Sequence, residues 1–548
     1  TILVFISREH CYQPSFPHII LKFKRGEGRV CSQFPRCQSV SHDPMLPRKF
    51  SSSTLPIFRS FINGKYVATG NITANNVSNS YYNLHSPVTG AIRAMVEPGT
   101  IEACHAAIEA AEQVQPKWYR DYSPKDRSSL LLRAAQLIQQ DADSISQLET
   151  EDTGRPRAET KGEAAAAADC LEWFAGLARS VGGQTLDLPN GDNWGYTRLE
   201  PLGVTVGIGA WNYPMASAIW KSAPALAFGN TMVFKPSEYT PQTALRVAEI
   251  YQHVGIPDGV FGVVLGDGQV GETLVQDPRV AKVSFTGSVD TGRHIYTNAA
   301  QQLKRVTLEL GGKSPLILWD DGSLDLAVSM AMAANWYSSG QVCSNGTRVF
   351  VHRTILEPFL ELLIERTKQL KIGDPMDETT QIGPMINQEH RIKVQEYIRI
   401  GLEEDRADLV YGGNRTLMDQ YPQGNFLEPA IFVKCTDDMR IVQEEIFGMV
   451  MTILPFDSEE EVIARANNTN FGLAAGIMTQ DLQRAHRVAA RLNAGVVWIN
   501  NYNLSPAELP WGGFKYSGIG SENGLAGVEA WTRIKSVYVE MNEMESPF

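Results

Sequence analysis

Gly203-Val204-Thr205-Val206-Gly207-Ile208 opens the part of the sequence that decides the fold. It is a short apolar run rich in valine and isoleucine, and similar runs follow at 231–234, 262–265 and 280–285. Stretches with helical spacing separate these runs, for example at 217–227 and 242–254. Because parallel strands need long crossover connections, the alternation predicts an α/β fold with an open parallel sheet of the nucleotide-binding type.

The sequence on either side extends this pattern. Upstream, Asn63-Gly64 lies between apolar flanks and predicts a β-hairpin. Apolar residues then recur at helical spacing and predict a helical layer at 101–118, 124–148 and 159–178. Downstream, a second alternating region predicts further strands at 314–319, 349–351, 450–454, 474–478 and 495–499.

The last strand-like segment, 534–539, alternates like a half-buried strand and has no obvious partner in the sequence. We expect an edge strand that another subunit completes. A chain of 548 residues also exceeds what one core usually serves, so several domains are expected. We predict a disordered or targeting segment at 1–57, a cofactor domain at 58–312 with a bridging segment at about 190–203, a catalytic domain at 313–520 and an oligomerisation segment at 521–548.

The composition argues against several classes of protein. No run approaches the roughly 18 consecutive apolar residues of a membrane span. The seven cysteines are thinly spread and show no zinc spacing with histidine, so we expect a reducing compartment and no metal site. The first 60 residues contain nine Lys or Arg and three acidic residues, a net charge of +6, so the rest of the chain carries −18 of the total of −12. An acidic body argues against a nucleic-acid partner.

Residues 1–57 have a different composition from the rest of the chain. They are basic, poor in acidic residues and end near Arg48-Lys49-Phe50-Ser51-Ser52-Ser53, which is typical of a mitochondrial targeting segment. The alternative is that this stretch is an artefact that is never translated. The sequence therefore leaves the cytoplasm and the mitochondrial matrix both open as locations.

Glu309 and Cys343 carry the chemistry that the sequence indicates most strongly. Glu309 lies in Leu308-Glu309-Leu310-Gly311-Gly312, and Cys343 follows Gly340-Gln341-Val342. A thiol is a good nucleophile at neutral pH, and a nearby carboxylate can activate water to release what the thiol has captured. A carboxylate between two leucines is expected to be buried, with a raised pKa that suits a general base. The alternatives are a small buried cysteine and a glutamate that accepts a backbone hydrogen bond.

Further polar residues follow predicted strands. Asn212 lies in a rigid turn, where its amide can donate to an oxyanion. Lys235 and Glu238 stand where an open parallel sheet binds a ribose, and Gly287 and Ser288 precede a helix whose N-terminus can receive a phosphate. Each signal is weak alone, because Asn is common in turns, a Lys/Glu pair is usually solvated and no Gly-x-Gly-x-x-Gly fingerprint is present.

Six motifs, in this order along the chain, resemble the aldehyde dehydrogenase superfamily from about Phe61 to the C-terminus. They are Ala210-Trp211-Asn212-Tyr213-Pro214, Phe234-Lys235-Pro236-Ser237, Ser284-Phe285-Thr286-Gly287-Ser288, Leu308-Glu309-Leu310-Gly311-Gly312-Lys313-Ser314-Pro315, Gly340-Gln341-Val342-Cys343 and Glu444-Glu445-Ile446-Phe447-Gly448. The resemblance implies that Cys343 attacks an aldehyde while the Asn212 amide and the Cys343 backbone N–H hold the oxyanion. Hydride then passes to NAD, and water activated by Glu309 hydrolyses the thioester. It also implies a cofactor domain, a catalytic domain and a small β bridge that joins subunits.

The same resemblance assigns cofactor contacts to Trp211, Lys235, Glu238, Gly287, Ser288, Glu445 and Phe447. Glu238 favours NAD over NADP, because a carboxylate near the ribose accepts the 2′-OH hydrogen bond and repels a 2′-phosphate. Met449 stands where the family usually has proline, and we expect weaker cofactor affinity at most.

Within the superfamily, the segments 340–351 and 500–506 look most like the branch acting on trimethylaminobutyraldehyde and betaine aldehyde. That branch would line its substrate tunnel with Tyr213, Trp220, Tyr337 and Trp511, and aromatic faces attract a quaternary ammonium. Aromatic residues also line apolar aldehyde tunnels, so a general aliphatic or semialdehyde dehydrogenase stays open. A reductive acyl-transferring enzyme and a catalytically silent paralogue are further alternatives. We expect a small-molecule aldehyde substrate, NAD as cofactor and no membrane partner, and the resemblance implies a homotetramer, with a dimer as the alternative.

Overall fold

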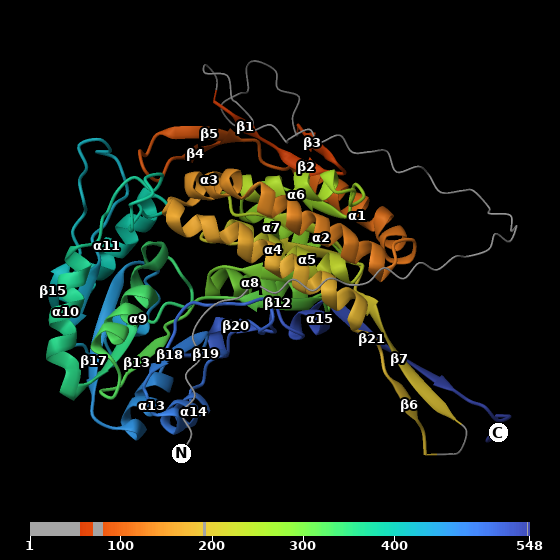
Figure 1. Cartoon of the computed structure of the whole chain (residues 1–548). Helices are drawn as coiled ribbons and strands as arrows, with labels where there is room; N and C mark the ends of the chain where they lie inside the picture. Colours follow the sequence, from red (N-terminus) through yellow and green to blue (C-terminus); the bar gives the residue numbers. More distant parts are fainter. Residues whose placement is uncertain (1–54, 69–80, 190–192, 545) are drawn as a thin grey trace, which may run out of the picture. The chain divides into compact units, whose positions relative to one another are not determined.

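The computed structural model describes residues 55–68, 81–189, 193–544 and 546–548, all within a compact unit that spans Phe50–Phe548. Two large sheets and two small sheets contain its strands (Figure 1). The predicted targeting segment at 1–57 therefore lies almost entirely outside the described residues.

The first large sheet has eight strands in the order β20-β12-β11-β8-β9-β10-β2-β3. Its five central strands run parallel: β8 (Val204–Ile208), β9 (Thr231–Lys235), β10 (Phe261–Val263), β11 (Val280–Thr286) and β12 (Arg305–Glu309). The predicted open parallel sheet is confirmed. Ile208 pairs with Lys235 and Thr286 pairs with Glu309, so the carboxyl ends of four neighbouring strands lie along one edge.

Alternating side chains of this sheet supply two separate cores. Met232 and Phe234 of β9 pack into one core, and Val233 between them packs into the other. The first core is covered by α2 (Pro124–Gln140), α4 (Arg157–Ser180), α5 (Pro214–Ala227) and α6 (Gln242–His253). The second is covered by α1 (Ile101–Arg120), α7 (Gly268–Gln276) and α8 (Val289–Ala300). A strand buried on both faces reads as a continuous apolar run, which is why periodicity identified these strands.

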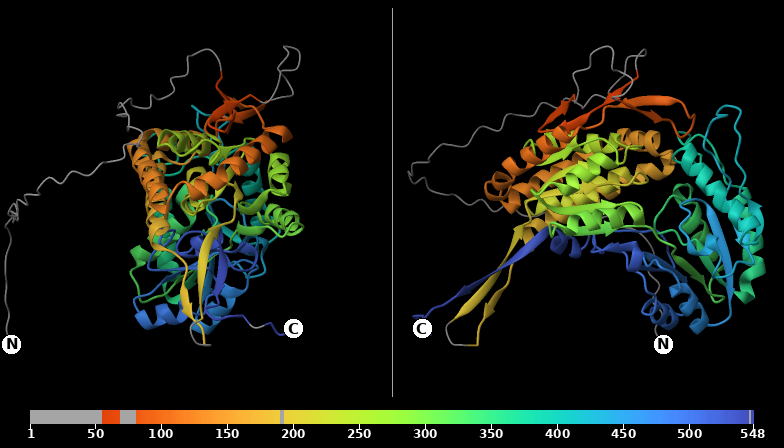
Figure 2. Two further views of the ribbon diagram at one scale, coloured as in Figure 1. Left: turned by 90° about the vertical axis from the view of Figure 1, so that its right-hand side faces the viewer. Right: turned by 180° about the vertical axis from the view of Figure 1, so that it is seen from behind.

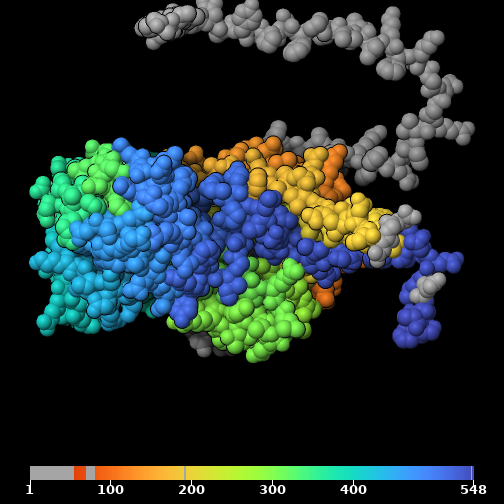
Figure 3. All heavy atoms as spheres, turned by 90° about the horizontal axis from the view of Figure 1, so that it is seen from below, coloured from red at the N-terminus to blue at the C-terminus, as the bar shows by residue number. Residues whose placement is uncertain are grey.

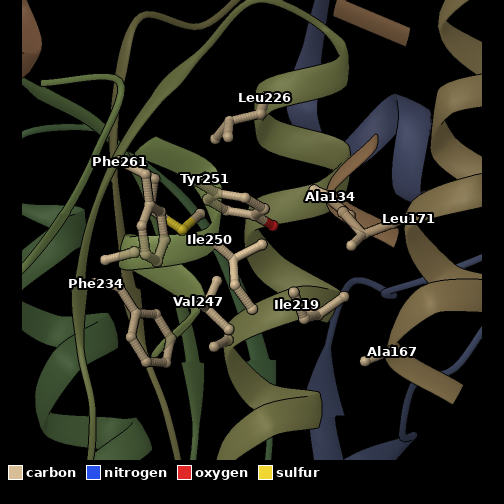
Figure 4. Packing of buried hydrophobic residues seen from close by; sticks show 14 of the residues in the cluster. Ala134, Ala167, Leu171, Ile219, Leu226, Phe234, Val247, Ile250, Tyr251 and Phe261 are labelled. Atoms are coloured by element: carbon tan, nitrogen blue, oxygen red, sulfur yellow. The ribbon is translucent and has the colours of Figure 1, made fainter. Parts of the chain in front are cut away.

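Figure 4 shows the first core from close by. Phe234 and Phe261 of the sheet lie beside Tyr251 of α6, with the Phe261 and Tyr251 ring centroids 5.2 Å apart. Ile219 of α5 and Leu171 of α4 complete the packing and are fully buried. Full burial of each such side chain contributes about 1.5–3 kcal/mol.

The helical layer before the sheet has one break that the sequence did not predict. The segment 124–148 is two helices, α2 and α3 (Ala142–Thr153), and Asp141 lies between them with φ −97° and ψ 12°. The Asp141 carboxylate accepts a hydrogen bond from Arg246 of α6. Arg246 lies far along the chain from Asp141. The apolar residues of 124–148 keep their helical spacing across Asp141, so the local sequence does not indicate the break.

The hairpin prediction is confirmed. β2 (Ser60–Ile62) and β3 (Lys65–Val67) pair antiparallel around Asn63 and Gly64. Asn63 has φ 47° and Gly64 has φ 74°, and two left-handed central residues define the type I′ turn that Asn-Gly favours.

The second large sheet has seven strands in the order β15-β16-β17-β14-β13-β18-β19. The predicted strands are β13 (Pro315–Leu318), β14 (Arg348–His352), β17 (Val450–Phe456), β18 (Ala474–Met478) and β19 (Val496–Ile499). The sequence missed β15 (Asp408–Gly412) and β16 (Ala430–Val433), which pair antiparallel at one edge. The helices of this region are α9 (Leu324–Trp336), α10 (Leu356–Lys368), α11 (Gln388–Glu403), α12 (Arg440–Gln443), α13 (Glu459–Asn467) and α14 (Leu482–Ala489).

The chain returns to the first sheet near its end. β20 (Gly518–Ile519) pairs with β12, and α15 (Ala526–Trp531) packs on α5. Figure 3 shows the C-terminal residues, in dark blue, running along the surface between the light-blue and the yellow parts of the chain. β20 thus joins the first sheet although it lies in the range 313–520, and the domain boundaries stay a prediction.

Two small sheets complete the fold. β1 (Ile57–Phe58), β5 (Ile92–Val96) and β4 (Tyr82–His85) form one. The other is a three-stranded ribbon of β21 (Thr532–Val539), β7 (Trp194–Pro201) and β6 (Thr185–Asp187) (Figure 2). The prediction of an edge strand at 534–539 is confirmed, and all eight residues of β21 pair with β7, a partner that was not obvious in the sequence. Among the described residues no helix is long and apolar enough to cross a membrane.

Candidate active site

A cavity of about 610 Å³ lies at the carboxyl ends of β8, β9, β11 and β12. Every residue predicted for catalysis or cofactor binding lines it: Cys343, Glu309, Asn212, Trp211, Lys235, Glu238, Gly287, Ser288, Glu445 and Phe447. These residues lie up to about 240 positions apart in the sequence. The parallel sheet brings them together because the carboxyl ends of its strands lie at one edge.

Glu309 ends β12 and is only 4% exposed. Neither of its carboxyl oxygens has a hydrogen-bond partner within the described part of the chain. Burial raises the pKa of this carboxyl well above its usual range, the charge of Glu522 raises it further, and Lys221 acts in the opposite direction. Lys221 and Glu522 form a buried ion pair at 2.6 Å. A buried carboxyl with a raised pKa and no partner beside a cavity suits a general base, because its deprotonated form takes up a proton more readily than an ordinary carboxylate does.

Cys343 follows α9 and a tight turn at Tyr337–Gly340, and its side chain is half-buried at the cavity. Burial raises the pKa of its thiol to about 12, and the charges of Glu445 and Glu309 add to the shift. Gly312 lets the Cys343 loop approach, because a Cβ at Gly312 would lie 2.5 Å from the Cys343 carbonyl oxygen. Likewise a Cβ at Gly311 would lie 2.1 Å from a carboxylate oxygen of Glu445. The glycine pair after Glu309 thus admits both the Cys343 loop and the Glu445 loop.

Asn212 lies in the turn between β8 and α5, and it is buried against the Cys343 loop. Its Nδ2 donates to the carbonyl oxygen of Gln341 at 3.0 Å. A side-chain amide has two N–H donors, so one remains to face a reacting oxygen in the cavity. This geometry fits the predicted oxyanion donor.

The predicted cofactor residues form two groups around the cavity. Lys235 ends β9, its Nζ lies 3.9 Å from the Glu238 carboxylate, and burial lowers its pKa. Ser288 is the N-cap of α8, so that helix begins at the cavity wall. In the second group Glu445 accepts a hydrogen bond from the Gly312 N–H at 3.1 Å.

His390 and Lys393 also line the cavity, and the sequence did not indicate them. The His390 ring lies 5.3 Å from Trp211 and 5.9 Å from Phe447, and Trp211 lies 5.2 Å from Phe447. His390 Nε2 is 2.7 Å from the Phe447 carbonyl oxygen, to which an N–H at this position donates. Burial lowers the pKa of His390 to about 4, so the ring is neutral. His390 occupies the first turn of α11 outside any motif, and no local signal could have found it.

The four predicted substrate residues lie outside this cavity and form two pairs. The Trp220 and Trp511 rings are 5.7 Å apart at 64°. Tyr213 and Tyr337 are linked through Arg155, whose guanidinium lies 3.9 Å from the centre of the Tyr213 ring and also contacts Tyr337. An internal cation therefore covers one face of Tyr213, which the sequence did not predict.

Three comparisons place the chain among known proteins. A family model described as the aldehyde dehydrogenase family matches residues 73–537. A betaine aldehyde dehydrogenase of Mesorhizobium japonicum is 50% identical over 494 residues, which cover 90% of this chain and 99% of the relative. A betaine aldehyde dehydrogenase of Brucella ovis is 52% identical over 452 residues, 82% of this chain and 91% of the relative.

Solved structures agree. A betaine aldehyde dehydrogenase from Staphylococcus aureus, in complex with NAD⁺, superposes with a TM-score of 0.86 at 37% identity and covers 89% of this chain and 96% of its own. A mutant aldehyde dehydrogenase from Bacillus cereus superposes with a TM-score of 0.84 at 38% identity, over 88% and 96% of the two chains. These relatives are bacterial and give no support to a mitochondrial location.

Proposed function

Because this chain belongs to the aldehyde dehydrogenase family, we propose that it oxidises an aldehyde to a carboxylic acid through a thioester on Cys343, which water activated by Glu309 hydrolyses. The observation that carries this proposal is the single cavity shared by the Cys343 thiol and the buried, unpartnered Glu309 carboxyl. Purified protein should form NADH from NAD when it is mixed with betaine aldehyde. Absence of NADH with this and other aldehydes would make it a catalytically silent member of the family.

When NAD is bound in this cavity, it would supply the acceptor for the hydride that leaves the aldehyde carbon. The position of the cavity suits a dinucleotide. It lies at the carboxyl ends of parallel strands, where such sheets bind nucleotides, and the N-terminus of α8 lies in its wall, where backbone N–H groups can bind phosphate. We propose that Lys235 and Glu238 hold the ribose, that Gly287 and Ser288 lie against the phosphates, and that Glu445 lies on the opposite wall. The carboxylate of Glu238 favours NAD over NADP.

The chain's own groups divide the remaining work. The Cys343 thiol gives up its proton to solvent and its sulfur bonds to the aldehyde carbon, and the free N–H of the Asn212 amide stabilises the oxygen that becomes negative. Loss of hydride leaves an acyl thioester on Cys343. Glu309 then takes a proton from water, whose oxygen attacks the acyl carbon, and the carboxylic acid leaves as the thiol is restored. Glu309 therefore acts after hydride transfer and Cys343 before it.

We propose a quaternary-ammonium aldehyde, betaine aldehyde or 4-trimethylaminobutyraldehyde, as the substrate. The relatives' names support this, and the neighbouring rings of Trp220 and Trp511, which pack edge to face, offer aromatic surface to a cation. Replacing Trp511 by leucine keeps apolar bulk but removes a π face. A cation–π contact of about 0.5–2 kcal/mol predicts that Trp511→Leu raises the KM for betaine aldehyde roughly 2- to 30-fold.

The matched control substrate is 3,3-dimethylbutanal, in which an uncharged carbon replaces the quaternary nitrogen of betaine aldehyde. Its KM should change little in Trp511→Leu. Steady-state kinetics with both aldehydes measures the difference. An equal rise of both KM values would show that Trp511 supplies bulk and not attraction for charge.

We also propose that the ribbon of β21, β7 and β6 joins subunits into a homotetramer. β21 is one of its two outer strands, and Ile534 and Tyr538 on β21 are 69% and 60% exposed. An apolar edge strand of this kind is prone to pair with another chain. Sedimentation of the purified protein should give the mass of four chains, and Ile534→Asp should give smaller species. A monomeric wild type would contradict the proposal.

A further inference from the structure

Two serines before the nucleophile have an unusual backbone. Ser338 has φ 52° and ψ 35°, and Ser339 has φ 54° and ψ 34°. Both residues are buried, and Gly340 continues the left-handed run with φ 74°. Consecutive left-handed residues other than glycine are strained and persist only where surrounding groups hold them. The contacts that stabilise Ser338 and Ser339 therefore affect the position of the Cys343 side chain.

Glu159 supplies most of the contacts of the Ser338 N–H and hydroxyl, whereas the Ser339 hydroxyl donates to the Gly383 carbonyl oxygen at 3.0 Å. Its two carboxylate oxygens each accept from the Ser338 backbone N–H at 3.1 Å, and Oε2 also accepts from the Ser338 hydroxyl at 2.9 Å. The Arg155 Nε donates to the same hydroxyl oxygen at 3.0 Å, and the Tyr213 OH lies 2.8 Å from it. One donated and two accepted bonds use the full capacity of a hydroxyl. Ser338 is therefore fixed at the backbone and at the side chain by α4 and its N-terminal flank and by the start of α5.

The turn is joined directly to the nucleophile loop. The Ser338 carbonyl oxygen accepts from the Gln341 backbone N–H at 3.1 Å and from Gln341 Nε2 at 3.2 Å. The Gln341 carbonyl oxygen in turn accepts from Asn212. A shift of Ser338 would therefore move Gln341, two residues before Cys343, and the Asn212 amide with it.

We propose that Glu159 is a positioning residue that holds the left-handed turn at Ser338 and Ser339 and thereby aims the Cys343 thiol into the cavity. The proposal rests on the proposed role of Cys343 as the nucleophile. Glu159 does not line the cavity that holds Cys343, and its carboxylate is hydrogen-bonded to Ser338, so the proposed action on Cys343 passes through Ser338.

Glu163 provides a matched control. It belongs to the same helix and pairs with Arg155 at 2.7 Å, but it makes no contact with Ser338 among the hydrogen bonds of the described residues. Glu159→Ala removes the acceptors of Ser338, Glu159→Gln keeps one acceptor oxygen, and Glu163→Ala removes a carboxylate from the cluster but leaves the turn held. Comparison of the three separates positioning from the charge of the cluster.

The first measurement is the rate at which iodoacetamide alkylates Cys343 without NAD or aldehyde. Peptide mass spectrometry at Cys343 is needed because the chain has seven cysteines. A misplacement of about 1 Å can cost on the order of 10²-fold in rate. We expect Glu159→Ala to slow alkylation and kcat at least about tenfold with an unchanged KM for NAD, Glu159→Gln to fall in between, and Glu163→Ala to stay near wild type.

The second measurement is a double-mutant cycle with Ser338→Gly. Glycine adopts a positive φ without strain, so the turn should depend less on Glu159 when residue 338 is glycine, although Ser339 keeps its positive φ. Glu159→Ala should therefore cost much less in the Ser338→Gly background than alone. If Glu159→Ala folds poorly, the same cycle can be measured with Glu159→Gln in place of Glu159→Ala, in the wild-type and Ser338→Gly backgrounds.

Wild-type alkylation and turnover in Glu159→Ala would overturn the proposal. So would an equal loss in Glu163→Ala, which would assign the effect to charge, or an undiminished loss in the Ser338→Gly background. A wild type that forms no NADH would refute the proposed function and leave the alkylation test standing.

Discussion

Cys343→Ala should abolish NADH formation, a loss of roughly 10⁶-fold of the kind seen when a covalent enzyme loses its nucleophile. No other cysteine of the described residues lines the cavity, and Cys104, Cys170 and Cys435 are buried elsewhere. The neighbouring Ser344 cannot replace the thiol, because its buried hydroxyl is bonded to the Asn503 side chain. Steady-state formation of NADH from betaine aldehyde and NAD, with NAD binding measured separately, tests this prediction.

Cys435→Ala is the control for this experiment. Burial raises the pKa of the Cys435 thiol to about 12, as it does for Cys343, but Cys435 lies away from the cavity. The control should retain activity. Turnover in Cys343→Ala, or an equal loss in Cys435→Ala, would contradict the role of Cys343.

Glu309→Gln should separate the two halves of the reaction. The amide occupies the same space but cannot accept a proton from water, so one equivalent of NADH should form rapidly and the later steady state should fall about 10²- to 10⁴-fold. In the wild type the base form of Glu309 exists only above its raised pKa. The steady-state rate should therefore rise with pH in the wild type and lose this dependence in Glu309→Gln.

Stopped-flow absorbance of NADH measures the burst and the steady state together. Glu149→Gln serves as the control, because Glu149 is also a fully buried carboxyl but lies outside the cavity, where it pairs with Arg155 at 3.7 Å. It should behave as the wild type does. Loss of the burst in Glu309→Gln, in step with the steady state, would instead place Glu309 in the first half of the reaction.

Local sequence patterns predicted much of this fold because the elements concerned are encoded locally. Asn63-Gly64 specifies its own turn, and strands such as 204–208 are continuous apolar runs because both of their faces are covered. The break at Asp141 coincides instead with a contact to Arg246, about a hundred positions away. The antiparallel edge pair β15 and β16 lacks the alternation with helices that marked the other strands.

The site was predicted in the same partial way. Motifs after strands identified the residues of the cavity, since the carboxyl ends of parallel strands meet at one edge. The left-handed turn at Ser338 and Ser339 could not be predicted from the sequence, because serine gives no signal for a positive φ. Glu159, which accepts the Ser338 hydrogen bonds, lies on a helix far away in the sequence. For the same reason Arg155 over Tyr213 and His390 against Phe447 emerged only from the structure.

The central claim is that Cys343 captures the acyl group and Glu309 releases it. The most direct test is to measure the mass of the covalent intermediate on Cys343. Glu309→Gln would be mixed with NAD and betaine aldehyde, quenched in acid within the burst, digested and examined by mass spectrometry. The account predicts that the Cys343 peptide carries the acyl group of the substrate, in an amount equal to the NADH formed. An unmodified Cys343 peptide beside a full burst of NADH would contradict it.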